Sequence, residues 1–265
     1  KKVDIPNCVT VLPMAGQGSR FLKEGYDIPK PFIPINGFPM FEQALRCLPN
    51  TSKTIFGSLK SHKDLFVLED YGKVVWLDDV LPGQACTTER IINHISNPNM
   101  SILVSACDNG ILYDSDKFLN LVNDFDNDII VWSYRNNFTS FRNPNAYSWL
   151  DVDDENIIRK VNVKDYKGVN PLDEFAVVGT MFFRNKEIYN NSLKKLYEKN
   201  IRTNGEFYID NLLNEAIQLG YIVRNFEVDE YICWGTPNDL KTYEYWQTFF
   251  NKVNWHPYEY EKDYF

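Results

Sequence analysis

The chain has 265 residues and a formal net charge of −8, with 44% hydrophobic and 24% charged residues. This composition is ordinary for a folded protein of one domain and argues against disorder in the middle of the chain. The acidic balance argues against broad nucleic-acid binding, which needs a basic face, and we expect neither a signal peptide nor a membrane-spanning segment.

Five cysteines occur without any Cys-x-x-Cys spacing, and three of them lie inside apolar runs. An odd number of cysteines without this spacing supports neither a disulfide framework nor a zinc site. We therefore expect reduced, buried thiols in a cytoplasmic protein.

The first apolar run, residues 8–15, predicts a buried strand that ends at a glycine-rich turn. Strands and helices then alternate as far as residue 134. The pattern predicts helices over Met40–Leu48, Lys63–Asp70, Gln84–Ile95 and Lys117–Phe125, and strands over Lys53–Leu59, Lys73–Leu77, Ser101–Cys107 and Asp128–Tyr134. Near-continuous apolar strands separated by amphipathic helices are typical of a mainly parallel sheet with helices on both faces, which binds ligands at the carboxyl ends of its strands.

The pattern changes after Phe138, where alternating residues around an acidic turn, Asp153–Asn156, predict a hairpin. We expect a single domain over 1–265, with halves 1–135 and 136–240 and a C-terminal helix and tail over 241–265. The tail from Trp255 is expected to lie on the body or on a neighbouring subunit, with frayed coil as the alternative. The remaining predicted elements are hairpin strands Ala146–Val152 and Ile157–Lys164, strands Phe175–Phe183 and Tyr221–Asp229, and helices Lys186–Asn200, Phe207–Leu219 (ended by Gly220) and Pro237–Val253.

The turn after the first strand reads Ala15-Gly-Gln-Gly-Ser-Arg20, and Pro29-Lys-Pro31 follows it. The two glycines let the backbone approach a ligand, the serine can cap the following helix, and the arginine and lysine supply positive charge. Free amide groups at such a strand-to-helix turn favour an anion, so we expect a phosphate-binding loop. The spacing matches neither the dinucleotide fingerprint G-x-G-x-x-G nor the P-loop.

This pair of motifs resembles the signature of the sugar-phosphate nucleotidyltransferases, in which a G-x-G-[ST]-R loop is followed by P-K-[PQ]. The resemblance extends to about Leu240 and implies a Rossmann-like, GT-A type α/β fold with a β-rich acceptor-binding insertion. It also implies that Arg20 neutralises the departing pyrophosphate and that Lys30 reaches phosphate oxygens at the reaction centre. The residues implied to bind the triphosphate of an NTP are Met14, Ala15, Gly16, Gln17, Gly18 and Ser19.

Asp108 follows the predicted strand Ser101–Cys107 and is the expected ligand of Mg²⁺, the expected cofactor, although it could instead cap a turn. The resembling family often has a second aspartate shortly before a Gly-Thr pair, and Cys233 stands near that place in this chain. A thiol is a poor ligand for Mg²⁺. Either Asp108 holds the metal alone or another acid substitutes, with the candidates Asp210, Asp229 and Glu230.

The base and acceptor sites rest on weaker patterns. Gly83 and Gln84 are implied by the resemblance to lie under the base, although an ordinary Pro-Gly turn also explains them. A catalytic lysine for the acceptor phosphate is expected at Lys164, with Lys167 as the fallback. The remaining candidates for acceptor binding are Asn109, Glu174, Gly179 and Glu206.

The resemblance implies a Mg²⁺-dependent nucleotidyltransferase that joins an NTP, with CTP or UTP favoured, to a small phosphorylated acceptor such as a sugar phosphate. A role in capsule or other surface-polysaccharide biosynthesis and a homo-dimer or larger homo-oligomer are expected, without nucleic-acid or membrane partners. One alternative is a GT-A glycosyltransferase, for which Asp151-Val-Asp153 formally provides a D-x-D motif. The other is a silent regulatory homologue, which would be expected to lose Arg20, Lys30 or Asp108.

Overall fold

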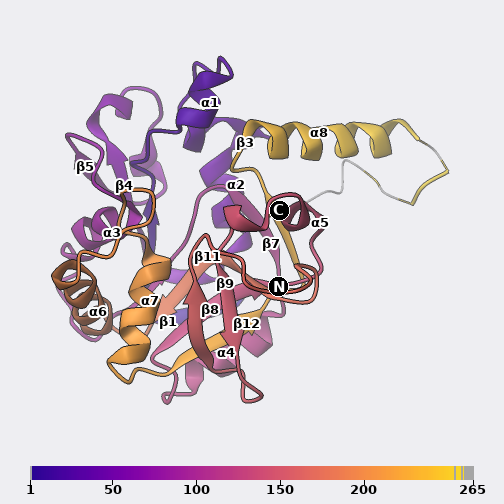
Figure 1. The fold of residues 1–265 in the computed structure, drawn as a ribbon. Coiled ribbons are helices and arrows are strands. Elements are labelled where there is room, and N and C mark those ends of the chain that lie inside the picture. The colour runs from indigo at the N-terminus through magenta and orange to yellow at the C-terminus, as the bar shows by residue number, and fades with distance from the viewer. Residues whose placement is uncertain (1, 254, 258, 260–265) are drawn as a thin grey trace.

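A nine-stranded sheet forms the centre of the computed structural model, which describes residues 2–253, 255–257 and 259 (Figure 1). Helices cover both faces of this sheet, so the expected α/β class is confirmed. The strands of the sheet are β1 (Asp4–Pro13), β4 (Asn50–Leu59), β5 (Lys73–Leu77), β6 (Ser101–Val104), β8 (Ile129–Tyr134), β9 (Trp149–Val152), β10 (Ile158–Asn162), β11 (Phe175–Phe183) and β12 (Val223–Glu227).

Strand β11 divides the sheet into two branches. One edge of β11 pairs with β8, which pairs with β12. On the other edge, the end of β11 (Met181–Phe183) pairs with β6, which continues the sheet through β1 and β4 to β5. The start of β11 (Phe175–Ala176) pairs on the same edge with β9, which is followed by β10. The register against β8 shifts between Val177 and Met181, and Gly179 lies within this bulge with a φ of 105°. We call this branch point, Val177–Met181, the fork.

Most strands run in the same direction, as the sequence predicts. β1, β4, β5 and β6 are parallel, and β8 and β12 are parallel to one another. Because β6 and β8 are both antiparallel to β11, all six of these strands end at the same edge of the sheet. The loops after β1, β5 and β6 therefore meet at this carboxyl edge, where a ligand is expected in such folds.

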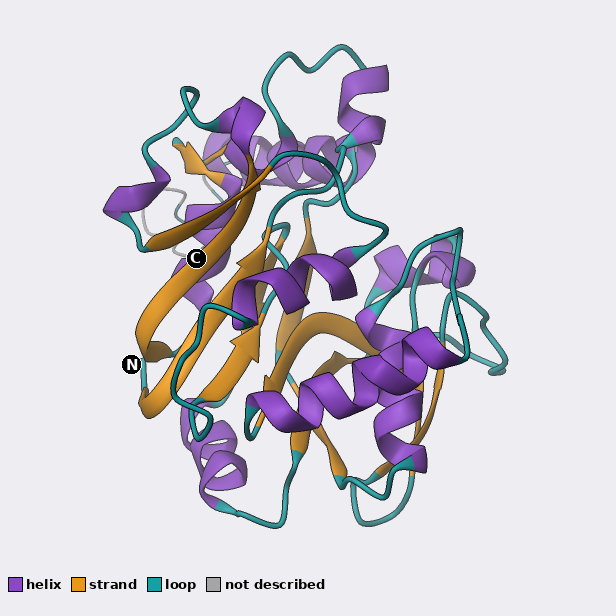
Figure 2. Ribbon diagram, turned by 90° about the vertical axis from the view of Figure 1, so that its left-hand side faces the viewer, coloured by secondary structure: helices purple, strands orange, loops and turns teal. Residues whose placement is uncertain are grey.

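Two apolar clusters hold the helices against the sheet. One cluster joins the sheet to α3 (Gln84–Ile92), α6 (Lys186–Glu198) and α7 (Ile209–Gln218), the side that Figure 2 faces. The other joins it to α2 (Met40–Cys47) and α4 (Ser115–Asn123), where Phe118 packs on Trp132 at a ring-centroid distance of 4.8 Å. Each fully buried aliphatic or aromatic side chain contributes about 1.5–3 kcal/mol to stability, so these clusters fix the positions of the strand ends.

The remaining elements lie outside the nine-stranded sheet. β13 (Glu230–Cys233) pairs antiparallel with β7 (Asn109–Leu112) and sets Cys233 opposite Asn109. A third apolar cluster, which includes Phe21, Ile33, Trp234 and Leu240, joins the loops after β1 to the start of the last helix. These elements are α1 (Ser19–Lys23), η1 (Lys30–Phe32), β2 (Pro34–Ile35), β3 (Phe38–Pro39), β7 (Asn109–Leu112), α5 (Phe138–Arg142), η4 (Pro144–Ala146), β13 (Glu230–Cys233) and α8 (Pro237–Lys252).

The helix predicted over Lys63–Asp70 is wrong, because the chain there forms only two 3-10 turns, η2 (Lys60–His62) and η3 (Leu68–Asp70). Leu65 and Val67 are exposed, whereas Leu68 is buried and Phe66 stacks on the Phe32 ring. This alternation buries every second residue, which a helix of 3.6 residues per turn cannot do.

The strand predicted over Ser101–Cys107 is shorter, since β6 ends at Val104. Ser19 is the first residue of α1 and not its cap; Gly18 takes the cap position with a φ of 60°. The predicted division of one domain at residues 135 and 240 stays a prediction, although β8 and β11 join its two halves in one sheet.

No helix within residues 2–253 has both the length and the apolar character to cross a membrane. Most of the tail after Trp255 lies outside the described residues, so the expectation about its contacts stays a prediction.

Candidate functional site

The loop after β1 presents open backbone. Met14 is tied to β4 by its amide, which donates to the Gly57 carbonyl at 2.7 Å. Among the described residues, no carbonyl accepts a backbone hydrogen bond from the amides of residues 16–19. Gly18 has a left-handed φ, and a Cβ there would lie 3.3 Å from the Cβ of Lys30. The loop can therefore offer free N–H groups to an anion close to Lys30.

Lys30 and Asp108 form an ion pair with 2.5 Å between Nζ and Oδ2, and each side chain is about a quarter exposed. Burial lowers the pKa of the Lys30 ammonium, but the Asp108 carboxylate together with Cys107 and Cys233 raises it, and the pKa is raised overall. Burial alone would raise the pKa of Asp108, but Lys30, a backbone hydrogen bond and the charge of Arg20 together lower it. Both groups therefore stay ionised.

Three backbone hydrogen bonds hold the turn that carries Asp108. The Ser105 amide donates to Val11 of β1 at 3.0 Å, and the Ala106 amide donates to Gly179 in the fork at 3.1 Å. The Trp234 amide donates to the carbonyl of Asp108 itself at 2.8 Å. Asp108 is thus fixed from the first strand, from the fork and from the segment after β13.

Gly235 packs directly on the Asp108 carboxylate. A Cβ at Gly235 would lie 2.7 Å from Oδ2 of Asp108 and 3.3 Å from Sγ of Cys233. Any larger residue at this position would displace the carboxylate. The structure therefore sets Cys233 beside Asp108, where the resembling family carries a second aspartate.

Lys164 reaches the same centre from the end of the hairpin. Its φ of 53° is left-handed, and its Nζ donates to the carbonyl of Ala146. Burial lowers the pKa of Lys164; Asp210 opposes this effect, and the positive charge of Arg20 adds to it. Lys167, the fallback, instead pairs with the exposed Asp165 at 2.9 Å. The geometry favours Lys164 over Lys167.

Gly83 is clamped by the segment that precedes α7. The Phe207 amide donates to Pro82 at 2.9 Å, and the Ala85 amide donates to Phe207 at 3.1 Å. Gly83 has a φ of 117°, and a Cβ there would lie 2.5 Å from the backbone oxygen of Phe207. Gln84, the next residue, is exposed as the first residue of α3.

The expected acceptor residues fall in different places. Asn109 is buried beside Asp108, where its Nδ2 donates to Val178 and its Oδ1 has no partner among the described residues. Gly179 lies in the fork. Glu174 accepts from the Val169 amide at 2.8 Å, so its carboxylate is engaged in its own loop. Glu206 is exposed next to Phe207 and so lies on the Gly83 side.

The formal D-x-D motif has a structural use. Asp153 accepts hydrogen bonds from the amides of Glu155 and Ile157 at 2.9 Å and pairs with Arg159, so it shapes the hairpin turn. Asp151 accepts from the Asn162 amide group. Neither observation favours a glycosyltransferase metal site.

The carboxylates near Asp108 bear on how a metal could be held. The described residues contain no group of three or more His, Cys, Asp or Glu side chains suited to a metal. Burial and the nearby Asp108 raise the pKa of Cys233 to about 12, so its thiol stays protonated and suits a hard cation poorly. A Mg²⁺ ion needs only one or two carboxylates when nucleotide phosphates complete its shell, and Asp108 fits that role.

The other candidate carboxylates are less suitable. Glu230 begins β13, three residues from Cys233, which is about 10 Å along a strand, and Asp229 lies one residue farther. Asp210 accepts from the Ser148 hydroxyl at 2.5 Å and faces Lys164. Burial raises its pKa, and these two partners only partly offset that effect.

Gly235 and Phe207 are the site residues that the sequence prediction misses. Phe207 acts through its backbone, which leaves no signature in residue type. Gly235 follows Cys233 by two residues in the Trp-Gly-Thr segment, so its place beside the expected second aspartate was a usable signal.

Comparison with known proteins identifies the fold. No family model matches the chain. The bifunctional protein GlmU of Methanococcus aeolicus is 25% identical over 179 residues, which are 66% of this chain but only 40% of GlmU. The chain therefore spans two fifths of the length of that relative.

Solved structures match over almost their whole length. A nucleoside-diphosphate-sugar pyrophosphorylase from Vibrio cholerae is 20% identical, with a TM-score of 0.69 over 88% of this chain and 98% of its own. The inositol-1-phosphate CTP transferase of T. maritima is 19% identical, with a TM-score of 0.70 over 92% and 97% of the two chains. These structures confirm the Rossmann-like fold, and the sequence match to GlmU bears out the resemblance to the nucleotidyltransferases.

The clamp on Gly83 gives a stability prediction. We expect Gly83→Ala to lower the free energy of unfolding by about 2–4 kcal/mol, because left-handed strain adds to a collision with the backbone of Phe207. Gly220→Ala is the matched control: its φ is 88° but nothing lies within 4 Å of the added Cβ, so the loss should be about 1–2 kcal/mol. Equal losses in chemical denaturation would show that Phe207 does not clamp this turn.

Proposed function

We propose that this chain is a Mg²⁺-dependent nucleotidyltransferase that joins an NTP to a small phosphorylated acceptor and releases pyrophosphate. The observation that carries the proposal is the Lys30–Asp108 ion pair at the carboxyl edge of the sheet, with the charges of Arg20 and Lys164 near enough to interact with it. Three cations and one carboxylate from separate segments suit a reaction between anions. The free amides of the loop after β1 add neutral donors to the same edge.

In the proposed reaction, an oxygen of the acceptor phosphate attacks the α-phosphorus of the NTP. A new P–O bond forms while the bond to the departing pyrophosphate breaks. The barrier comes largely from repulsion among the phosphates, so cations held at fixed points lower it. When bound, Mg²⁺ supplies the largest local positive charge.

The residues have distinct roles in this scheme. Lys30 stays protonated beside Asp108 and can turn its ammonium toward a phosphate oxygen that arrives near it. Arg20, exposed at the start of α1, stabilises the charge of the departing pyrophosphate. Lys164 is held through Ala146 and orients the acceptor phosphate.

The donor and acceptor are also part of the proposal. We favour CTP or UTP with a polyol or sugar phosphate destined for a surface polysaccharide. The fold neighbour from T. maritima, a CTP transferase for inositol 1-phosphate, supports a cytidine donor and a cyclic polyol acceptor. The similarity to GlmU supports the proposed nucleotidyltransferase class. Because this chain matches only 40% of the length of that bifunctional protein, we do not propose that it has both GlmU activities.

An array of NTPs against phosphorylated sugars and polyols, read by pyrophosphate release, tests the proposed activity. We expect one pair to react in the presence of Mg²⁺. Arg20→Ala and Lys30→Ala should lower its turnover by about 10²–10³-fold, because single electrostatic contacts of this kind are worth about 3–4 kcal/mol. Activity that both variants retain in full would belong to another site or to a contaminant and would reject the assignment.

Two lysines of the hairpin region make a matched pair. We expect Lys164→Ala to raise the KM for the acceptor and to lower kcat, because the Lys164 ammonium lies near enough to Arg20 and Asp108 to interact with their charges. Lys167→Ala should leave both within about twofold, because it removes only a surface ion pair worth about 0–1 kcal/mol. The opposite order of effects would move the acceptor site to Lys167.

The metal site makes its own prediction. If Asp108 is the one strong ligand among the described residues, as proposed, calorimetry should detect only weak Mg²⁺ binding to the nucleotide-free protein, and Cys233→Ser should not change this. Cys233→Asp adds a carboxylate beside Asp108 and should tighten metal binding without nucleotide at least about tenfold, with Asp108→Asn abolishing the gain. Tight binding by the unaltered protein would point to a ligand other than Asp108.

A further inference from the structure

Helix α8 projects from the body along much of its length (Figure 1). Of its sixteen residues only Pro237, Leu240 and Gln247 are buried. Its first turn is anchored by Thr236, which caps the helix by accepting from the Asp239 amide at 3.1 Å. The base of α8 is therefore fixed, while its second half offers a long side to solvent.

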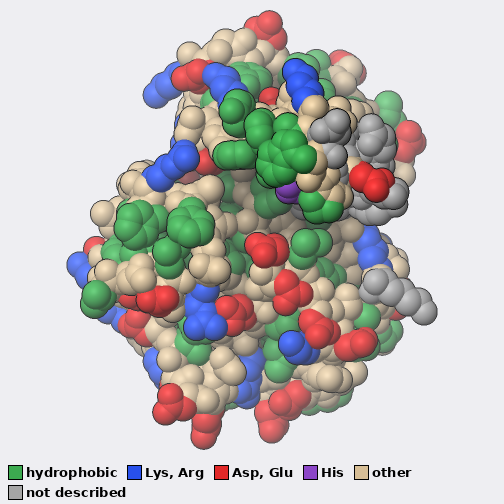
Figure 3. All heavy atoms as spheres, turned by 90° about the vertical axis from the view of Figure 1, so that its right-hand side faces the viewer, with side chains coloured by type: hydrophobic (Ala, Val, Ile, Leu, Met, Phe, Trp, Pro, Cys, Tyr) green, Lys and Arg blue, Asp and Glu red, His purple; other side chains and the backbone are tan. Residues whose placement is uncertain are grey.

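The exposed side of α8 is aromatic. Tyr245 and Trp246 are 63% and 49% exposed, and the Trp246 ring contacts Phe249 at a centroid distance of 5.8 Å. Spacings of three and four residues place Tyr245, Trp246 and Phe249 on the same side of the helix, and we call them the α8 stripe. Figure 3 shows hydrophobic side chains gathered on the upper part of the face toward which α8 projects. Exposed apolar patches of this kind mark interaction surfaces.

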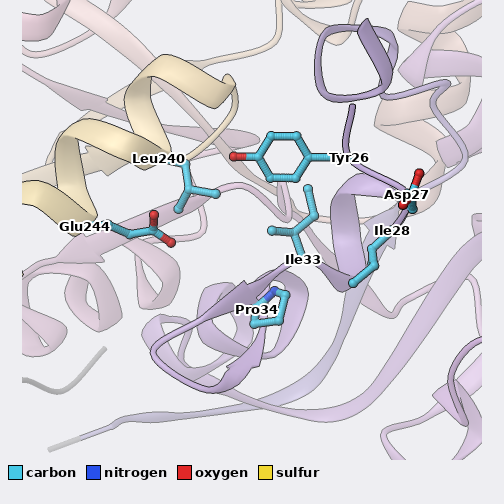
Figure 4. A pocket seen from close by; sticks show the side chains of 7 residues that line it. All are labelled: Tyr26, Asp27, Ile28, Ile33, Pro34, Leu240 and Glu244. Atoms are coloured by element: carbon cyan, nitrogen blue, oxygen red, sulfur yellow. The ribbon is translucent and has the colours of Figure 1, made fainter. Parts of the chain in front are cut away.

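A hollow of about 540 Å³ lies between α8 and the two segments that flank Lys30, residues 26–28 and 33–34 (Figure 4). Glu244, which directly precedes the stripe, lines this hollow, and partial burial raises the pKa of its carboxyl. The other lining residues are Tyr26, Asp27, Ile28, Ile33, Pro34 and Leu240. The hollow therefore has an acidic rim that a cation could approach.

We propose that α8 is a dimerisation surface that pairs with α8 of a second copy, antiparallel about a two-fold axis near the exposed Thr248. In such an isologous contact a residue before the axis lies level with the residue equally far beyond it. Glu244 precedes Thr248 by four residues and Lys252 follows it by four, so each Glu244 lies level with the partner subunit's Lys252. The two ion pairs then form at the rims of the two hollows.

The stripe residues fit between these ion pairs. Tyr245 is three residues before the axis and so lies level with the partner subunit's Asn251, which lets its ring pack on the aliphatic stem of the neighbouring Lys252 of the partner subunit. Phe249 directly follows Thr248, so the two copies of this ring meet beside the axis. Trp246 directly follows Tyr245, so its side chain points farther round the helix and covers the margin of the contact. The proposed contact thus has an aromatic centre and charged ends.

The charges on α8 favour a second copy over a membrane as the occupant. The helix carries Lys241 and Lys252 against Asp239 and Glu244, so it has no excess of basic charge. A helix that binds an anionic membrane surface needs such an excess, and the whole chain has a net charge of −8. When two copies of α8 lie antiparallel, the acidic Glu244 of each copy faces the basic Lys252 of the partner subunit, so the helix is complementary in charge to a second copy of itself.

Light scattering and sedimentation of the full chain over a concentration series test the proposal. We expect a species of twice 31.1 kDa. Tyr245→Glu should convert it to monomers with unchanged circular dichroism. Glu244→Lys and Lys252→Glu should each weaken the dimer at least about tenfold, and the double reversal E244K/K252E should restore it, because the ion pairs are re-formed with exchanged signs.

These variants lie outside the reaction centre, so pyrophosphate release per chain should stay unchanged when the dimer is lost. The outcome thus separates this proposal from the proposed activity. A monomer at all concentrations would overturn the inference. So would a dimer insensitive to Tyr245→Glu, a double reversal that behaves no better than the single ones, or binding to anionic phosphatidylglycerol vesicles in place of self-association.

Discussion

The ion pair between Lys30 and Asp108 is the interaction on which the site depends. Both side chains are three quarters buried, and each keeps its charge because the other is 2.5 Å away. Removing one partner from a buried pair leaves an uncompensated charge that costs several kcal/mol. The turn with Asp108 is held by β1, by the fork and by Trp234, whereas Lys30 is held by the short η1 turn. The protein thus stores a positive and a negative charge at the point where, in the proposed reaction, phosphate and metal would meet.

The branching of the sheet explains why this centre lies where it does. β11 pairs with β9 before the fork and with β6 after it. The chain after β6 therefore has no strand pairing with β11, and it turns outward there with Asp108. Gly179 supplies the left-handed bulge, and Gly235 leaves room for the carboxylate. The thiol of Cys233 beside that carboxylate sets this chain apart from the two-aspartate pattern of the resembling family. In the proposed site, Asp108 is the one carboxylate on the metal, so metal binding would depend on the phosphates that arrive with it.

The sequence predicts the alternating strands and helices well, because apolar periodicity is a local property that burial on both faces of a sheet preserves. Lys30 and Asp108 are also found from the sequence, because Lys30 stands in a motif and Asp108 follows the apolar run that contains β6. Contacts between distant segments are less predictable: Phe207 clamps Gly83 through its backbone, and β7 pairs with β13 across more than a hundred residues. The stretch Leu65–Leu68 leads to the wrong prediction of a helix. A short continuous run of apolar residues fits a helix and an extended segment equally well, and only its packing decides between them.

The most direct test of the central claim is a crystal structure of the protein with CTP or UTP and Mg²⁺. The account predicts the triphosphate against the amides of residues 16–19, with the Lys30 ammonium shifted from Asp108 to a phosphate oxygen and Asp108 on the metal. A triphosphate bound away from this loop, or a Lys30–Asp108 pair that stays closed while nucleotide is bound, would contradict it.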